Sequence, residues 1–348
     1  MNTDIIFKKN MSKTKIETPV SELRKDLVSN TWVVVADKRS RRPRSFKKKV
    51  EKKITGEELK KEKEKCPFCH LDKKENLLTY KKKNGAWNLR VIPNDFPAFI
   101  HKTSLNIHDE GPFRVMNGVG FCEVIITRSH TKQVSQMTVP EITEIIDAFQ
   151  VRYLALMNQR HIKYISIFQN YGKEAGASIK HPHFQLIATP MVDPDIYRSL
   201  HGSRKYFESN HECVHCVMLE WEMKSKKRIV FENDEFVVLC PFASRIAFET
   251  RIYPKRHLAY FERTGTKLKI QLAEAVGFAL ARIKKQLGDP AYNFFLHTAP
   301  CDGRTYDHYH WHFEILPKIS IWAGFELGTG TEICSVKPEK AAEILRKK

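Results

Sequence analysis

The chain has 348 residues, of which 42% are hydrophobic and 28% are charged, and its formal net charge at pH 7 is +19. This composition is typical of a globular protein with one large core or two domains of ordinary size. The sequence contains no apolar run of about 18 residues, and its first twenty residues lack the apolar stretch of a secretion signal. We therefore expect a cytoplasmic protein with no membrane partner.

The positive charge is concentrated at the start of the chain. Residues 1–65 contain 20 Lys and Arg but only 10 Asp and Glu, and this excess of 10 positive charges is about half of the net charge of the chain. The basic run 38–49 is consistent with a nucleic-acid or nuclear-localisation patch, but also with a loop beside an anionic substrate. Because no nucleic-acid-binding motif is recognisable, we do not expect nucleic acid as a partner.

Four of the eight cysteines form two Cys-X-X-Cys pairs, Cys66 with Cys69 and Cys213 with Cys216. Without a secretion signal, a disulfide framework is not expected. The spacing is that of a metal chelate, and a redox role is the alternative. The histidines that follow each pair favour zinc.

After each Cys-X-X-Cys pair, the same elements follow in the same order. A strand ending in histidine is followed by an amphipathic helix, a strand and a second strand carrying His-X-His. These segments are 123–130, 140–159, 164–168 and 181–185 in the first half, and 249–257, 268–287, 292–296 and 310–314 in the second. The pattern predicts an α+β fold of two tandem modules, each a mostly antiparallel sheet with a packed helix.

The repeat also predicts the domain organisation and two metal sites. We assign 1–22 to a basic tail, 23–200 to an N-terminal catalytic half and 201–348 to a C-terminal half. Each half offers two thiolates and two imidazoles, a closed tetrahedral set that leaves no position for substrate, so both zinc ions should be structural. The expected ligand sets are Cys66, Cys69, His130 and His181, and Cys213, Cys216, His257 and His310.

The segment 170–185 joins a loop rich in Gly and Ser to the sequence His-Pro-His. On a strand, His181, His183 and Gln185 would share one face and point into the same cleft. An isolated His-X-His is often a chance pair on a half-exposed strand. The loop before it favours a phosphate site in which one imidazole binds metal and the next attacks phosphorus.

The chain resembles the galactose-1-phosphate uridylyltransferases of the histidine-triad superfamily from about Leu23 to Leu345. The matching segments are 24–32, 39–43, 91–96, 170–185, 297–300, 310–313 and 324–326. The resemblance implies that His183 attacks the α-phosphorus of a nucleotide sugar and becomes a nucleotidyl-histidine. A hexose 1-phosphate then takes the nucleotidyl group, in a ping-pong mechanism.

The resemblance also implies roles for residues around the nucleophile. Gln185 would donate to a phosphoryl oxygen, and because an amide cannot deliver a proton, this fits transfer better than hydrolysis. Ser178 would act with the amides of Gly176 and Ala177 as a phosphate cradle. Further substrate contacts implied are Asn170 near the phosphates or sugar, Arg39 and Arg42 at the diphosphate, Asn94 and Asp95 at the ribose, and Glu326 at the sugar. In the second half, Glu314 replaces the glutamine, so that half should bind metal and shape the sugar pocket.

Several positions leave the substrate open. Phe184 stands where uridylyltransferases usually have glycine, and a ring beside the nucleophile would change nucleotide access. The paired Cys-X-X-Cys sites and the segment 324–330 are closer to relatives that act on ADP-glucose. His297, His308 and His312 offer a histidine group of the kind that binds iron in some relatives, so the second metal could be iron.

The leading hypothesis is a UDP-glucose–hexose-1-phosphate uridylyltransferase of galactose metabolism that works through a covalent uridylyl-histidine. The alternative within the family is an ADP-glucose phosphorylase or adenylyl transferase. A more distant alternative is a zinc-containing nucleic-acid-binding protein. The resemblance further implies a homodimer whose substrates are a nucleotide sugar and a hexose 1-phosphate.

Overall fold

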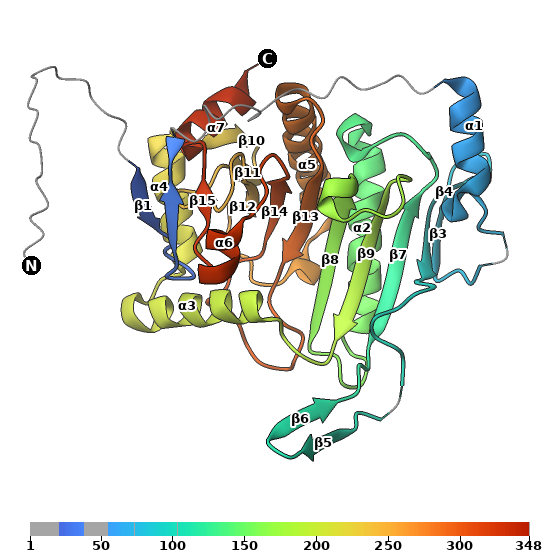
Figure 1. Ribbon diagram of the computed structural model, residues 1–348, viewed down its shortest axis with the longest axis horizontal. Helices are drawn as coiled ribbons and strands as arrows, with labels where there is room; N and C mark the ends of the chain where they lie inside the picture. Colours follow the sequence, from blue (N-terminus) through green and yellow to red (C-terminus); the bar gives the residue numbers. More distant parts are fainter. Residues whose placement is uncertain (1–20, 38–54, 73, 103, 348) are drawn as a thin grey trace, which may run out of the picture.

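A ten-stranded sheet forms the centre of the computed structural model, which describes residues 21–37, 55–72, 74–102 and 104–347 (Figure 1). The first half contributes β3 (Leu78–Lys81), β4 (Trp87–Pro93), β7 (Phe121–Thr127), β8 (Tyr164–Tyr171) and β9 (His183–Thr189). The second half contributes β10 (Ile229–Glu232), β11 (Phe236–Leu239), β12 (Thr250–Pro254), β13 (Tyr292–His297) and β14 (His312–Pro317).

The two halves of this sheet repeat each other. The strand order is β3-β4-β7-β9-β8 in the first half and β10-β11-β12-β14-β13 in the second, and every neighbouring pair is antiparallel. β8 pairs with β13 in the middle, with Asn170 opposite Asn293. The α+β fold with two repeated modules is confirmed. The repeat alone did not predict that the two sheets join edge to edge.

The two expected amphipathic helices are α2 (Val139–Leu156) and α5 (Thr266–Leu287), which lie side by side on one face of the sheet (Figure 1). A capping box formed by Thr138 and Glu141 begins α2 and satisfies backbone N–H groups of its first turn. Gly288, with a left-handed φ of 73°, ends α5.

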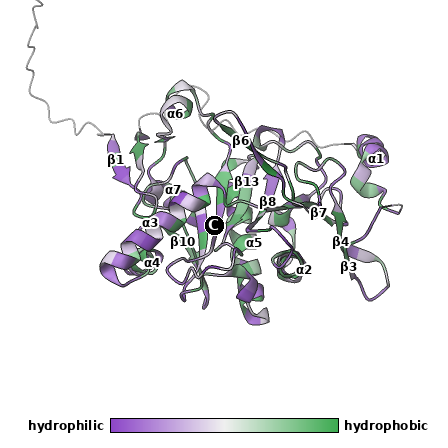
Figure 2. Cartoon of the chain, turned by 90° about the horizontal axis from the view of Figure 1, so that it is seen from below, coloured by the Kyte–Doolittle hydropathy of each residue, from purple (hydrophilic) through white to green (hydrophobic). Residues whose placement is uncertain are grey.

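One hydrophobic core runs beneath both halves of the sheet. It includes Ile145 and Phe149 of α2, Leu272 of α5 and Phe294 of β13. In Figure 2 the central strands are mostly hydrophobic, whereas α3 (Pro194–Asn210) is largely hydrophilic. The shared core makes the two modules one packed unit, so each half can fix side chains in the other.

A small sheet brings the two ends of the described chain together. β2 (Trp32–Val35) pairs antiparallel with β1 (Glu22–Lys25) and parallel with β15 (Ile333–Cys334). Val33 and Val35 pack against Ala243 and Cys334, so the first strands of the chain lie against the second half. The expected domain boundary at residue 200 falls within α3.

The remaining elements surround the sheet. β5 (Ile107–Glu110) and β6 (Phe113–Met116) form a hairpin that projects from the body (Figure 1). The other helices are α1 (Gly56–Lys65), α4 (Val214–Ser225), α6 (Gly324–Thr329) and α7 (Pro338–Arg346). Among the described helices, none has the length and apolar content needed to span a membrane.

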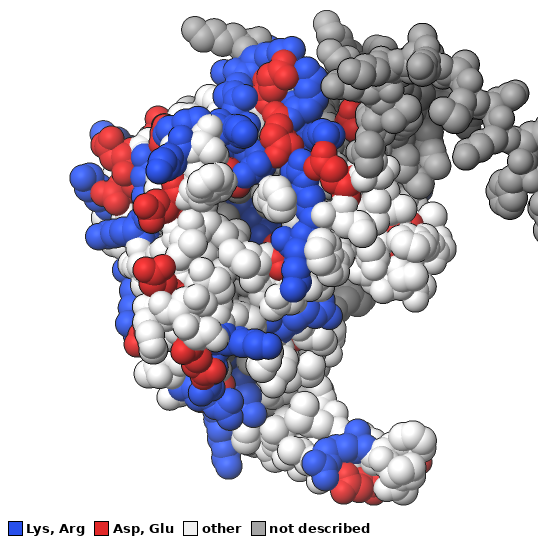
Figure 3. Space-filling model, turned by 90° about the vertical axis from the view of Figure 1, so that its left-hand side faces the viewer, with Lys and Arg blue, Asp and Glu red and all other residues white. Residues whose placement is uncertain are grey.

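On the face shown in Figure 3, Asp and Glu interrupt the Lys and Arg side chains. Exposed charges also pair elsewhere in the described chain, as Arg204 does with Glu208 and Lys226 with Glu232. A mixed surface of this kind differs from the continuous basic stripe of a nucleic-acid interface. The basic run at 38–49 lies outside the described residues.

Candidate active site and metal centres

His183 is the first residue of β9, and its neighbours fix its tautomer. Its Nδ1 lies 2.8 Å from the backbone oxygen of His181. Because a carbonyl oxygen only accepts, Nδ1 must carry the proton and Nε2 must carry the lone pair. Burial lowers the pKa of His183, and the bond to His181 offsets part of that shift. The neutral imidazole is therefore the form present at pH 7, with a nucleophilic nitrogen available.

The loop from Asn170 to Ser178 leads from β8 toward this histidine. Two glycines with left-handed φ, Gly172 at 80° and Gly176 at 89°, bracket its short 3₁₀ turn. The N–H groups of Gly176 and Ala177 donate to the backbone oxygens of Lys173 and Gly172 at 3.0 and 3.1 Å. These two amides therefore close the loop itself and are not free for the expected phosphate cradle. Ser178 is exposed and makes no hydrogen bond with another described residue, so its hydroxyl and backbone N–H can donate to a ligand.

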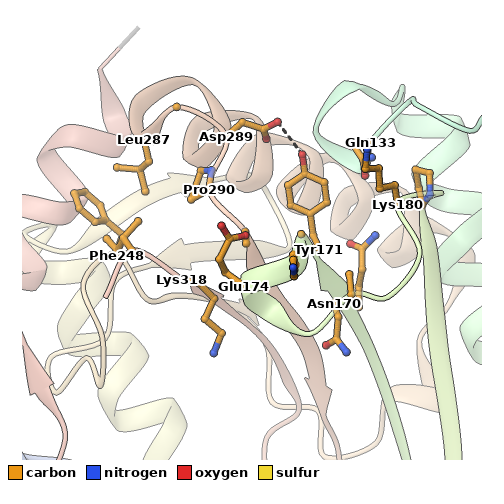
Figure 4. A pocket seen from close by; sticks show the side chains of 18 of the residues that line it. Gln133, Asn170, Tyr171, Glu174, Lys180, Phe248, Leu287, Asp289, Pro290 and Lys318 are labelled. Atoms are coloured by element: carbon orange, nitrogen blue, oxygen red, sulfur yellow. Dashed lines mark hydrogen bonds between the residues drawn. The ribbon is translucent and has the colours of Figure 1, made fainter. Parts of the chain in front are cut away.

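A cavity of about 1060 Å³ opens beside the loop and His183. One wall comes from the first half and includes Asn170, Lys173, Ser178 and His183. The opposite wall comes from the second half and includes Phe248, Leu287, Asp289 and Lys318 (Figure 4). This volume is at the upper end of the range for small-molecule sites, roughly 300–1,000 Å³. The cavity is large enough for a nucleotide sugar.

The first expected metal group assembles as predicted. Cys66, Cys69, His130 and His181 offer ligand atoms within 4.8 Å of one another. His181 lies just before β9 and turns away from the strand face, so that its Nδ1 is 3.6 Å from both sulfurs. Its Nε2 donates to the backbone oxygen of Thr127 at 2.6 Å, which leaves the lone pair on Nδ1. The donor set therefore fits a tetrahedral metal ion.

The second metal group repeats this arrangement in the other half. Cys213, Cys216, His257 and His310 also offer ligand atoms within 4.8 Å. The Nε2 atoms of His257 and His310 face the backbone oxygens of Asp307 and Pro254 at 2.7 and 3.0 Å. Both imidazoles thus direct Nδ1 toward sulfur, as His181 does. Both groups could hold a metal ion.

His312 is the counterpart of His183 in the second half, but a carboxylate faces its Nε2 atom. Nδ1 of His312 faces the backbone oxygen of His310 at 3.1 Å, as in the first half, but its Nε2 lies 3.5 Å from Glu314. Glu314 also pairs with Arg245 and with Arg251, whose Nε lies 2.9 Å from Oε1. His297, His312 and Glu314 are close enough to share a cation. Two guanidinium groups already neutralise this carboxylate, so an ion-pair cluster explains the group better than a metal does.

A family profile and a similar protein of known name were both found for this chain. Residues 11–193 match the profile described as "Galactose-1-phosphate uridyl transferase, N-terminal domain", and residues 125–348 match a domain of unknown function, DUF4921. The chain is 34% identical over 339 residues to ADP-glucose phosphorylase of Arabidopsis thaliana, covering 95% of this chain and 94% of that protein. The chain belongs to the galactose-1-phosphate uridylyltransferase family.

Other members of the family extend this similarity over nearly the whole chain. Galactose-1-phosphate uridylyltransferase of Thermotoga maritima is 29% identical over 338 residues, covering 93% of this chain and 98% of that protein. A crystal structure of ADP-glucose phosphorylase from Arabidopsis thaliana with bound ADP-glucose superposes with a TM-score of 0.79 at 31% identity, covering 94% of this chain and 99% of that one.

Within this family fold, the other expected site residues lie in different places. Gln185 follows His183 on the same face of β9 and is half-buried between Phe168 of β8 and Val124 of β7, outside the cavity lining. Asn94 accepts from the N–H of Phe96 at 2.9 Å, Asp95 pairs with Lys74 at 2.8 Å, and Glu326 accepts from the N–H of Ala323 at 3.0 Å. None of these three lines the cavity. Arg39 and Arg42 lie outside the described residues.

Phe184 does not face the substrate, contrary to the expectation from sequence. Its side chain is only 2% exposed and packs against Phe149 of α2, with a ring-centroid distance of 5.1 Å. Successive side chains on a strand point to opposite faces, so Phe184 enters the core while His183 faces the cavity. The aromatic ring beside His183 is instead Phe68, and the two ring centroids are 5.0 Å apart.

Sequence reasoning missed the wall supplied by the second half. Asp289 accepts from the hydroxyl of Tyr171 at 2.7 Å, the bond drawn in Figure 4. Lys318 lines the same cavity, and burial together with repulsion from Arg245 lowers its pKa. No motif marks these positions, because they reach the loop only through the pairing of β8 with β13.

Proposed function

We propose that this protein is a nucleotidyltransferase that takes a nucleotidyl group from a nucleotide sugar onto Nε2 of His183. The observation that carries the proposal is the fixed tautomer of His183 at a large cavity beside the loop from Asn170 to Ser178. A buried, neutral imidazole with its lone pair directed away from His181 is a competent nucleophile.

The geometry supports a first step that needs no proton transfer to His183. Nε2 supplies its electron pair to the α-phosphorus, the bond from phosphorus to the bridging oxygen breaks, and sugar 1-phosphate leaves with that electron pair. The imidazole becomes cationic, because Nδ1 keeps its proton. That charge is stabilised by the backbone oxygen of His181, which already accepts from Nδ1.

The second step reverses the first with a different anion. A phosphate oxygen of the acceptor attacks phosphorus, the phosphorus–nitrogen bond breaks, and its electron pair returns to Nε2. Asn170 and Ser178, which line the cavity, are the neutral donors proposed for the phosphoryl oxygens. Neutral donors suit transfer, because they hold the oxygens without protonating the leaving group.

Two donor substrates are candidates. The uridylyltransferase relatives favour UDP-glucose, with a hexose 1-phosphate of galactose metabolism as acceptor. The 34% identity to ADP-glucose phosphorylase and the superposition with its ADP-glucose complex favour ADP-glucose, with inorganic phosphate as acceptor. Both candidates use the same covalent step at His183.

Intact mass after brief incubation with UDP-glucose or with ADP-glucose, under non-acidic conditions, tests the proposal. A uridylyl or an adenylyl adduct identifies the donor, and His183→Ala should form neither adduct while it keeps both metal ions. An adduct that persists in His183→Ala would refute the role of His183. No adduct from either donor on the folded, metal-loaded protein would refute the proposed activity.

We further propose zinc in both Cys₂His₂ groups. Four ligands close the tetrahedral shell, so zinc would contribute folding free energy and would leave the reaction to His183. In the first half the metal would fix His181, whose backbone oxygen orients His183.

A homodimer is the oligomeric state that we propose. The segment around Glu326 exposes Ile321 at 93%, Phe325 at 50% and Leu327 at 71%, and none of these three residues lines the cavity. Exposed apolar residues grouped in this way are typical of interaction surfaces. Light scattering of the purified protein should give twice the chain mass, and a monomer would refute this assignment.

A further inference from the structure

Asn293 of β13 connects the second half of the protein to the phosphate-binding loop of the first. Its side-chain Nδ2 donates to the backbone oxygen of Ala175 at 2.9 Å and to Oδ1 of Asn170 at 2.8 Å. We infer that Asn293 is a positioning residue that fixes the orientation of the Asn170 amide, so that Asn170 presents its NH₂ group to the phosphates. The inference deepens the proposed function and rests on it for the identity of the ligand.

The orientation of both amides follows from one backbone group. The oxygen of Ala175 can only accept, so the Asn293 atom that faces it must be the NH₂ group. The second hydrogen of that NH₂ group points at the side chain of Asn170, which must therefore offer its oxygen. The NH₂ group of Asn170 is then turned to the other side of its amide, where it carries two hydrogens to donate.

That NH₂ group lies near Gly176, in the loop that borders the cavity. A Cβ built on Gly176 would be 3.8 Å from Nδ2 of Asn170, an ordinary van der Waals distance. Asn170 lines the cavity together with Ser178 and His183. A donor in this position attracts a phosphoryl oxygen, whereas the amide oxygen in the same position would repel it.

Other contacts hold the backbone of the loop, so the role of Asn293 can be separated from folding. The hydroxyl of Tyr171 donates to Asp289, and the Tyr171 and Tyr292 rings pack at a centroid distance of 4.9 Å. A Cβ on Gly172 would be 2.6 Å from the Cβ of Ala291, which shows how closely the two segments approach. Without the Asn293 side chain the loop stays seated, and the Asn170 amide becomes free to rotate.

Two substitutions at this position separate orientation from packing. Asn293→Asp has nearly the same size but offers only acceptors, so it should turn the NH₂ group of Asn170 toward itself and its oxygen toward the phosphates. It also places an oxygen against that of Ala175, an effect that does not pass through Asn170. Asn293→Ala leaves both orientations accessible. We expect the rate constant for nucleotidylation of His183 to fall about 100-fold in Asn293→Asp and about 10-fold in Asn293→Ala, in line with the loss of one preorganised donor.

The test measures this rate constant, and the affinity for ADP and UDP by calorimetry, in the full-length metal-loaded protein. Each Asn293 variant is also made in an Asn170→Ala background. If Asn293 acts through Asn170, Asn293→Asp should cause a much smaller loss there, limited to the effect of its contact with the Ala175 oxygen. Tyr292→Phe is the control, because it removes a 3.1 Å bond to Gln169 between the same two strands and should leave the rate within about threefold.

The outcomes distinguish this inference from the proposed function. An equal loss from Asn293→Asp in both backgrounds would overturn the orienting role, and so would normal rates in both Asn293 variants. If the parent protein formed no adduct with either nucleotide sugar, the proposed function would fail. The affinities for ADP and UDP would then decide the inference, which requires Asn293→Asp to bind both about tenfold more weakly than the parent.

Discussion

Neutralising Glu314 tests whether the second-half cluster is held by arginines or by a metal. The carboxylate is 2% exposed and pairs with Arg245 and Arg251, which a glutamine cannot balance. Burial alone would raise the pKa of Glu314, but the two guanidinium groups hold it well below its usual range. In Glu314→Gln, Glu249 is the one carboxylate among the described residues that still pairs with both arginines.

The expected loss of stability follows from removing one partner of a buried ion pair, which costs about 3–5 kcal/mol. The unfolding entropy of a chain of this size is roughly 0.7 kcal/mol per kelvin, so the melting temperature should fall by about 4–7 °C. Glu208→Gln, which breaks an exposed pair with Arg204, is the matched control and should shift it by less than about 1 °C. Scanning calorimetry at pH 7 measures both.

Metal analysis of the same samples completes the experiment. The arginine-held cluster predicts two metal ions per chain in both the parent protein and Glu314→Gln. A third ion in the parent, lost in Glu314→Gln, would refute the ion-pair interpretation and would indicate a metal bound by His297, His312 and Glu314. An unchanged melting temperature would refute the stated energetics.

Three further changes have defined outcomes. Burial alone raises the pKa of Glu339, but hydrogen bonds from Arg24 and Arg228 outweigh burial and lower the pKa to about 2. Glu339→Gln should therefore destabilise the protein by about 1–3 kcal/mol at pH 7. Urea titrations should show this difference shrinking as the pH falls from about 4.5 toward 2, because the carboxylate becomes protonated in that range. Phe184→Ala should cost about 3–5 kcal/mol in denaturant unfolding yet keep the ratio of UDP-glucose to ADP-glucose labelling, and a changed ratio would contradict its place in the core. Cys66→Ser should lose one metal ion by elemental analysis and lower thermal stability, and retention of both ions would exclude this cysteine as a ligand.

Much of the site was predictable because its residues lie close together in the sequence or repeat at a fixed interval. The two Cys₂His₂ groups followed from matching spacings, and the structure brings all eight side chains together in two sets of four. The His183 cavity followed from the loop and strand that adjoin it. Both helices began and ended near the expected residues, because capping signals and apolar periodicity are local.

Other features depended on contacts between distant segments. The N–H groups of Gly176 and Ala177 donate to backbone oxygens within the loop. Residue types could not predict these hydrogen bonds, because any glycine-rich loop offers the same N–H groups. The direction of the Phe184 ring depended on where β9 begins, since a shift of one residue reverses which side chains face the core. Asn94, Asp95 and Glu326 matched family motifs but lie away from the cavity of their own chain.

The sequence by itself determined which reactive residues lie close together, namely the His-Pro-His segment beside a loop rich in Gly and Ser and two sets of cysteine and histidine side chains. Local periodicity, capping and ligand spacing are properties of short segments, so they can be recognised without coordinates. Only the tertiary structure decided that β8 and β13 join the two halves into one sheet. That pairing places Asp289 and Asn293 against the loop, because strand neighbours are set by the packing of the whole core and not by any signal in either strand.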